Sequence, residues 1–434
     1  MSETVHIPQL RFPEFSGDWN RVKIQKLLDD KSIISHLDGN HGALYPRSEE
    51  FTKEGVPYVT ANDFINGKVD LKKCKCLPVE RASQFKKGIA HNGDVLFAHN
   101  ATVGPVALLE TDLEYVVLST TATYYRCDNN TLINKYLKVY LTSNDFVRQY
   151  SRVMSQSTRN QVPITTQRLF YINLPDKPEQ QKIAAFLTAV DSKIEQLSKK
   201  QELLGEYKKG LMQQIFSQAI RFRAGDTPGQ PLLPNGNSPS GCDFPDWEEK
   251  KLGGIGSFYR GHTYNSTNVK NNGLLVLRSS NIKNDKLVLD KDLQFVDKIC
   301  SDKISLRTDD IVICMANGSK HLVGKSGVYY GDYDNKLTVG AFCSIFRTDN
   351  KLSKYILQTV QYKRYLHILL AGTNINNLKN SELAELKFNL PVSINEQTKI
   401  ANFLSSIDSK IEQVSKQLVE SKQFKKALLQ QMFV

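Results

Sequence analysis

The chain has 434 residues, of which 40% are hydrophobic, and a formal net charge of +12, so two soluble, basic domains are expected. The apolar runs are too short to cross a membrane, no secretory signal pattern is visible, and seven scattered cysteines argue against a disulfide framework. These features indicate a reduced, cytoplasmic compartment. The charge favours nucleic acid as a partner, although an ordinary basic surface is the alternative.

The first half mixes short apolar segments with turn residues. Segments 56–60, 94–98 and 121–126 are short and rich in β-branched and aromatic residues, which predicts strands, and 132–150 has a helical pattern. We assign residues 1–177 to a first globular domain. A long helix follows over 178–220.

The second half repeats this order. Residues 221–242 are rich in Pro, Gly and Ser, which predicts a linker without regular structure. A second strand-rich domain is expected over 243–391. A helix over 392–434 closes the chain.

The two helices are close copies of each other. Residues 179–199 return, 217 positions later, as residues 396–416, whereas the two globular parts resemble each other more weakly, with similar strands and different loops. A common task is therefore expected for the helices and a different task for each domain.

Apolar residues in both helices follow a 4-3 spacing, which is typical of a coiled coil. The spacing is broken at Gln201, Lys208, Ser421 and Lys425. We expect the copies to pack on each other as an antiparallel intramolecular pair, which makes the molecule pseudo-two-fold symmetric; dimerisation with a second chain is the alternative. Each helix begins with a capping-box pattern, in which Glu179 and Glu396 would bond free amides of the first turn.

A two-fold helix pair offers the same surface twice, so any partner is expected to bind in two copies. Phe186 and Phe403 lie at matching positions beside the apolar stripe and are candidate partner-binding residues. They could equally belong to the core between helix and domain.

No catalytic or metal-binding pattern is found. Segment 318–326 ends like a phosphate-binding loop, but its glycines have the wrong spacing, and the histidines show no metal-ligand spacing. We expect no catalytic residue, no metal and no cofactor in this chain.

The loops instead carry polar and basic side chains suited to base edges and phosphates. Each could also be a solvated turn, but as a set in two basic domains they favour DNA. The candidate DNA-binding residues are Thr60, Asn62, His99, Asn100, Thr102, Ser157, Thr158, Arg159, Arg278, Ser279, Ser280, Asn281, Asn317, Ser319, Lys320 and Lys325.

The pattern Leu-Pro, Glu-Gln-x-Lys-Ile-Ala-x-Phe-Leu and Ile/Val-Asp-x-Lys-Ile, at 174–194 and 390–411, resembles the repeated region of type I restriction-modification specificity subunits. Residues 10–19 are similar to the start of that family's target recognition domains. The resemblance covers the whole chain. It implies an α+β fold of two similar strand-rich DNA-recognition domains separated by the helix pair.

The resemblance also implies a function. Such a subunit is not an enzyme: it binds double-stranded DNA, and each domain reads one half of a bipartite, asymmetric target. Its implied partners are two methyltransferase (modification) subunits that use S-adenosylmethionine, and motor-nuclease (restriction) subunits that use ATP and Mg²⁺. A coiled-coil adaptor without a DNA role and a stand-alone DNA-modifying enzyme are the alternatives.

Overall fold

The structure, a computed structural model, describes residues 7–39, 45–156, 158–223, 233–234, 244–371 and 376–433. The chain forms two compact units. Unit 1 comprises Met1–Gln201 and Val414–Val434, and unit 2 comprises Glu202–Gln413. Each long helix therefore contributes to both units. Most of the linker predicted over 221–242 lies outside the described residues.

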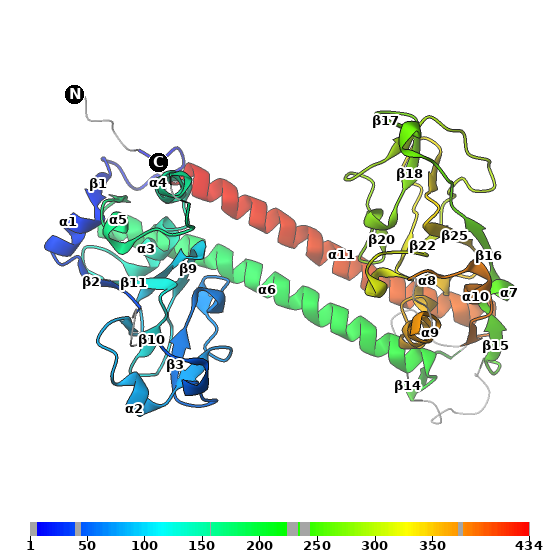
Figure 1. The fold of residues 1–434 in the computed structure, drawn as a ribbon, viewed down its shortest axis with the longest axis horizontal. Coiled ribbons are helices and arrows are strands. Elements are labelled where there is room, and N and C mark those ends of the chain that lie inside the picture. The colour runs from blue at the N-terminus through cyan, green and yellow to red at the C-terminus, as the bar shows by residue number, and fades with distance from the viewer. Residues whose placement is uncertain are drawn as a thin grey trace. The chain divides into compact units, whose positions relative to one another are not determined.

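Unit 1 holds two main sheets and a two-stranded ribbon (Figure 1). The six-stranded sheet has the order β2-β11-β8-β9-β5-β4, the four-stranded sheet β6-β3-β10-β7, and the ribbon pairs β1 with β12. The strands are β1 (Asn20–Lys23), β2 (Ile33–Asp38), β3 (Val56–Val59), β4 (Phe64–Ile65), β5 (Lys68–Val69), β6 (Lys75–Leu77), β7 (Ile89–Ala90), β8 (Val95–Asn100), β9 (Thr102–Leu108), β10 (Val116–Leu118), β11 (Ala122–Cys127) and β12 (Tyr171–Leu174). The helices are α1 (Ile24–Asp29), α2 (Val79–Ala82), α3 (Asn134–Tyr140), α4 (Asn144–Ser155), α5 (Ile164–Gln167) and α6 (Lys177–Phe216), which continues into unit 2.

Unit 2 repeats the six-stranded sheet and the ribbon of unit 1, while its four-stranded sheet has its additional edge strand on the opposite side. Its six-stranded sheet has the order β16-β25-β22-β23-β20-β19, its four-stranded sheet β17-β21-β18-β24, and β15 pairs with β26. The strands are β13 (Ile220–Arg221), β14 (Leu233–Pro234), β15 (Glu248–Lys251), β16 (Ser257–Arg260), β17 (Val269–Lys270), β18 (Leu274–Leu277), β19 (Ile282–Lys283), β20 (Lys286–Leu287), β21 (Phe295–Val296), β22 (Ile311–Cys314), β23 (Ser326–Val328), β24 (Leu337–Val339), β25 (Cys343–Arg347) and β26 (Lys387–Leu390). The helices are α7 (Leu252–Ile255), α8 (Ser353–Ile356), α9 (Val360–Ala371), α10 (Asn380–Ala384) and α11 (Ile394–Gln431), which continues into unit 1.

The predicted α+β class with two similar strand-rich domains is confirmed, and the predicted strands lie within one or two residues of β3, β8 and β11. The single helix predicted over 132–150 is instead two helices. Ser143 ends the first of them because its hydroxyl accepts the Phe146 amide and so caps a new helix, α4.

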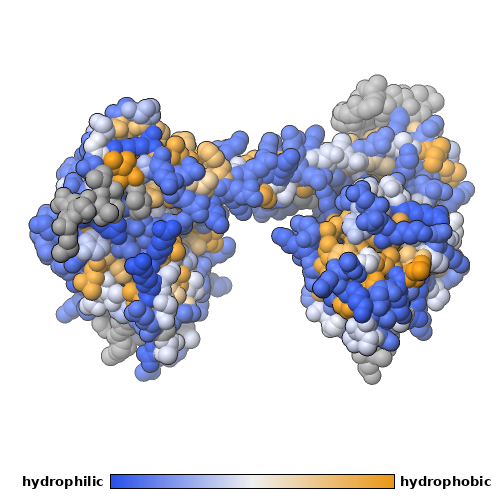
Figure 2. All heavy atoms as spheres, turned by 90° about the horizontal axis from the view of Figure 1, so that it is seen from above, coloured by the Kyte–Doolittle hydropathy of each residue, from blue (hydrophilic) through white to orange (hydrophobic). Residues whose placement is uncertain are grey.

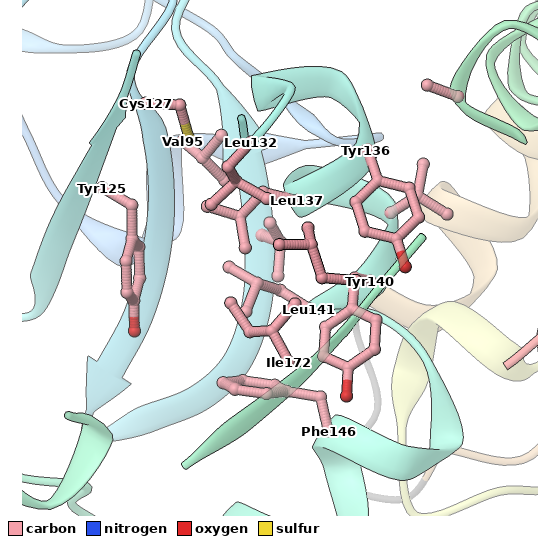
Figure 3. Packing of buried hydrophobic residues seen from close by; sticks show 14 of the residues in the cluster. Val95, Tyr125, Cys127, Leu132, Tyr136, Leu137, Tyr140, Leu141, Phe146 and Ile172 are labelled. Atoms are coloured by element: carbon pink, nitrogen blue, oxygen red, sulfur yellow. The ribbon is translucent and has the colours of Figure 1, made fainter. Parts of the chain in front are cut away.

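The main core of unit 1 lies where α3 and α4 pack on the long helices. Figure 3 shows Tyr136 and Tyr140 of α3 next to aliphatic residues of the same cluster, including Leu141 and Ile172. Phe433, from the end of α11, packs against both tyrosine rings. The last residues of the chain thus complete the core that the first half builds.

The two long helices run antiparallel within each unit. In unit 1, Asp191 of α6 pairs with Lys425 of α11 at 2.5 Å. In unit 2, Lys208 of α6 pairs with Asp408 of α11 at 2.7 Å. Both partners of the first pair lie 217 positions from their equivalents in the second, so the repeat duplicates the ion pair. The lysines that interrupt the apolar spacing are therefore bound to the opposite helix.

The glutamates predicted to cap the helix starts bind side chains instead. Both Glu179 carboxylate oxygens accept bonds of 2.7 Å from Arg11, and Oε2 also accepts the Trp19 indole N–H at 3.1 Å. Glu396 binds Arg221 at 3.1 and 3.0 Å and Trp247 at 3.1 Å in unit 2. Both glutamate side chains are fully buried. The capping interpretation was wrong because a charged partner from a distant segment satisfies each carboxylate.

The residues next to these arginines cover the predicted partner-binding rings. Phe12 packs edge-to-face on Phe186 at 5.7 Å, and Phe222 does the same on Phe403 at 5.6 Å. In unit 1 the segment that holds Arg11 and Phe12 lies next to the end of α11, because the Leu10 amide donates to the Gln431 carbonyl. In unit 2 the equivalent connection follows the end of α6 along the chain.

On the face drawn in Figure 2, each unit is mainly hydrophilic and also shows hydrophobic residues at the surface. Among the described residues, every helix is too short or too polar to cross a lipid bilayer.

Candidate nucleic-acid interface

Two of the predicted loops of unit 1 meet at the turn between β10 and β11, and a third is joined to one of them. Thr121 lies in this turn; its hydroxyl accepts the Ala61 amide at 2.9 Å, and its carbonyl accepts the His99 amide at 3.0 Å. The loop after β8 is also tied to the segment before α5, because the Ala101 amide donates to the Asn160 carbonyl. Segments 60–63, 99–102 and 158–161 therefore form one edge, which we call edge 1.

Unit 2 has an equivalent edge at the turn between β24 and β25. The Phe342 carbonyl accepts the amides of Met315 and Ala316 at 2.8 and 3.2 Å. The Asn317 side chain donates to the Ser279 hydroxyl at 3.1 Å, so the loop after β22 is tied to the turn after β18. Segments 278–281, 316–320 and 376–377, together with Phe342, form edge 2.

The predicted DNA-binding residues differ in exposure. Six are exposed, and these are Asn62, Thr102, Thr158, Arg159, Ser319 and Lys320. Seven are partly buried, and these are Thr60, Asn100, Arg278, Ser279, Ser280, Asn317 and Lys325. His99 and Asn281 are buried. Ser157 lies outside the described residues.

Some of the partly buried residues form hydrogen bonds that hold the loops of the edges in place. Thr60 bonds through its amide and hydroxyl to Asp63, and the Arg278 amide bonds in the same way to Asn281. The Arg278 guanidinium binds Asp292 at 2.7 Å. These contacts hold the two short turns, each a 3₁₀ turn (Ala61–Asp63 and Ser279–Asn281), in the same conformation.

Other predicted residues also make internal contacts. The His99 ring lies 3.1 Å from the Val162 carbonyl, and the Lys325 ammonium donates to the Ile282 carbonyl at 3.0 Å. The Asn281 side chain donates to the Lys291 carbonyl at 3.1 Å. These three residues position the loops, while the exposed residues of the same loops are available to a ligand.

The prediction missed segment 376–377 of edge 2. The Asn376 carbonyl accepts the Asn317 amide, and its side chain donates to the Gly318 carbonyl at 3.1 Å. Asn377 pairs with Ala316, as Gln161 pairs with Asn100 in unit 1. Gln161 and Asn377 lie 216 positions apart, close to the 217-residue offset of the helix repeat. This near-match was the signal that could have identified the segment.

A buried histidine, His36, contacts Gln167, which binds the backbone next to edge 1. His36 stacks on Tyr125 at 4.1 Å, and its Nε2 lies 3.2 Å from the Gln167 side-chain oxygen, which also accepts the Tyr125 hydroxyl at 2.6 Å. Gln167 donates in turn to the Val162 carbonyl, next to the bridge with the loop after β8. Burial, with a smaller contribution from the nearby Arg168 charge, lowers the pKa of His36 to about 3.

This pKa predicts acid sensitivity of unit 1. Between pH 6.5 and 3 the unfolded chain binds a proton that buried His36 does not, so stability falls as the pH falls, by about 1.4 kcal/mol per pH unit. We expect His36→Phe, which keeps a ring against Tyr125, to flatten this dependence. Urea unfolding of unit 1, followed by Trp19 fluorescence in a Trp247→Phe background at pH 7, 6 and 5, measures it. An unchanged slope in the variant would exclude His36 as the titrating group.

Among the described residues, no group of three or more His, Cys, Asp or Glu side chains is arranged to hold a metal ion. The edges present amides, hydroxyls and cationic groups. Such groups bind base edges and phosphates.

The fold uses one framework twice, with different exposed side chains on each copy. The chain belongs to the type I restriction modification DNA specificity domain family, whose model matches residues 34–204 and 245–421.

The similar proteins are specificity subunits. The type I restriction enzyme MjaVIII specificity subunit of Methanocaldococcus jannaschii is 25% identical over 97% of this chain and 92% of its own length. The EcoKI specificity subunit of Escherichia coli is 28% identical over 42% of this chain and 41% of its own length. The crystal structure of a type I restriction-modification S subunit from M. genitalium shares the fold, with a TM-score of 0.59 at 16% identity over 99% of each chain.

Proposed function

We propose that this chain is the non-catalytic DNA-specificity subunit of a type I restriction-modification complex, acting in the cytoplasm. Each unit reads one half of a bipartite, asymmetric target through its edge. The observation that carries the proposal is the contrast between the two edges, whose backbones are held by equivalent hydrogen bonds. Unit 1 has Asn62, Thr121 and Gln161 at the positions where unit 2 has Ser280, Phe342 and Asn377. Unlike side chains on one framework favour unlike half-sites.

The exposed residues of the edges are the best candidates for direct contact. Lys320 and Arg159 carry positive charge suited to phosphates or guanine, and Asn62 and Asn377 can bond to adenine. The buried residues of the earlier set, His99 and Asn281, act by positioning these loops.

The helices supply the function common to both halves. We propose that they set the distance between the half-sites and bind two methyltransferase subunits, which supply S-adenosylmethionine chemistry, while motor-nuclease subunits supply ATP- and Mg²⁺-dependent cleavage. The uncovered parts of Phe186 and Phe403 remain candidates for this contact. Tyr207 and Phe424, 217 positions apart and 55% and 54% exposed, extend the candidate surface on the helices.

Mapping of methylated DNA tests the proposed function. The chain is co-expressed with its methyltransferase subunit, and modified bases are located across the genome with and without it. We expect one adenine-methylated motif, formed by two unlike half-sites separated by an unspecified spacer. A methylation pattern that does not change when this chain is removed would reject the DNA role and favour an adaptor.

Lys320→Ala is expected to affect one half-site only. Lys320 is exposed on edge 2, so its loss should weaken binding to the full target at least about fivefold or relax the half-site read by unit 2. The half-site of unit 1 should not change. Lys336→Ala, at the far end of β24 and paired with Asp302, is the matched control. Equal loss at both half-sites would show that the units do not read DNA independently.

A further inference from the structure

Phe342 is an exposed aromatic residue in the middle of edge 2. Its side chain is 72% exposed, although the next residue, Cys343, begins the buried strand β25. Single exposed apolar residues are common on proteins and need no explanation by themselves. The position of this one, among loops proposed to bind DNA, is what gives it meaning.

The equivalent residue of unit 1 is Thr121, and the two backbones are held alike. In unit 2 the Cys343 amide donates to the Gly340 carbonyl, and in unit 1 the Ala122 amide donates to the Ser119 carbonyl, so both residues occupy the third position of a hydrogen-bonded turn. The Thr121 hydroxyl is used within the protein by the Ala61 amide. Phe342 cannot make such a bond, and its ring stays at the surface.

The backbone of Phe342 is fixed on both sides. Its carbonyl accepts the amides of Met315 and Ala316, and the next residue, Cys343, donates its amide to Gly340 and accepts the Gly261 amide. The ring therefore projects from a rigid turn. Because the backbone is already ordered, binding has to order only the two side-chain torsions of the ring.

The polar side chains beside the ring are engaged within edge 2. The Asn317 amide group binds the Ser279 hydroxyl and accepts the Ser319 amide, while Asn376 binds the Gly318 carbonyl. The Phe342 ring is an exposed apolar surface on edge 2, in addition to the exposed polar residues Ser319, Lys320 and Asn377. The apolar group that a base pair presents in the major groove is the 5-methyl group of thymine.

We propose that Phe342 is a specificity-determining residue, which packs its ring on the 5-methyl group of one thymine in the half-site read by unit 2. The inference rests on the proposed function and adds to it a contact between one residue and one base. Wedging of the ring between base pairs would be a different contact, one that does not depend on the methyl group.

The test uses the complex of the full chain with its methyltransferase subunit and duplexes carrying the mapped target. Each thymine of the half-site is replaced in turn by deoxyuridine, which removes only the methyl group. We expect one replacement to weaken binding by the wild-type complex about fourfold, the effect of one buried methyl group. Phe342→Ala should bind both duplexes equally, and Phe342→Leu should keep part of the difference.

Tyr330→Ala is the matched control, because Tyr330 is a half-exposed aromatic of the same unit that faces Asp408 and Glu412 of α11. It should retain the fourfold difference. The inference is overturned if no replacement affects the wild type, if Phe342→Ala keeps the difference, or if the half-site holds no thymine. Failure of the wild-type complex to bind any duplex specifically would instead reject the proposed function.

Discussion

Glu179→Ala is expected to destabilise unit 1 by about 3 kcal/mol, because it leaves the Arg11 guanidinium, only 14% exposed, without its counter-charge. The Trp19 indole N–H loses its acceptor as well. The corresponding fall in the melting temperature of a unit of this size is roughly 6–12 °C. Glu396→Ala should have the same effect on unit 2 through Arg221 and Trp247.

The two tryptophans of the chain make this prediction measurable unit by unit. Trp19 belongs to unit 1 and Trp247 to unit 2, so a Trp247→Phe background reports the unfolding of unit 1 alone. Glu14→Ala is the control, because its ion pair with Lys182 is largely exposed and contributes little. If the Glu179→Ala and Glu14→Ala variants have the same melting temperature, the buried ion pair does not stabilise unit 1.

Removal of one heptad from each long helix is expected to shorten the spacer of the target and leave both half-sites unchanged. Seven residues correspond to about 10 Å of helix, or about three base pairs. The deletions should be centred on Lys200 of α6 and on the equivalent Gln417 of α11, so that the ion pairs Asp191–Lys425 and Asp408–Lys208 keep their partners. Methylation mapping of the variant gives the new spacer directly.

A matched control removes seven residues from α6 alone. This variant shifts the register of one helix against the other, so the two ion pairs can no longer both form. We expect it to be less stable and to acquire no new target. An intact double-deletion variant that still modifies sites with the original spacer would show that the helices do not set the distance.

The repeated parts of the fold were predictable from the sequence. Several residues of the 4-3 apolar spacing are buried, and Ile183, Leu187, Ile400 and Leu404 belong to the cores of the two units. Strand periodicity located β3, β8 and β11 because these strands are short, apolar and bounded by turns. A local sequence pattern is sufficient to predict an element when the same pattern also determines which of its residues are buried.

The partners of polar groups were not predictable. Glu179 fits a capping box in sequence, yet it binds Arg11, 168 positions away. Rules based on neighbouring residues cannot predict a contact between residues so far apart in the sequence. Of the loop residues, Asn281 and Lys320 look equally suited to DNA in sequence, but one is buried and the other exposed. Only the tertiary fold separates a residue that shapes a loop from a residue that the loop presents.

The contact between Leu10 and Gln431 has a consequence for the order of the two halves. Unit 1 receives its N-terminal segment in the place where unit 2 receives the connection that follows α6, so the chain is topologically a closed circle of two repeats, opened at one of two equivalent junctions. We therefore expect a chain that begins with the second half, with Gln431 and Leu10 linked through a short peptide, to form the same two cores.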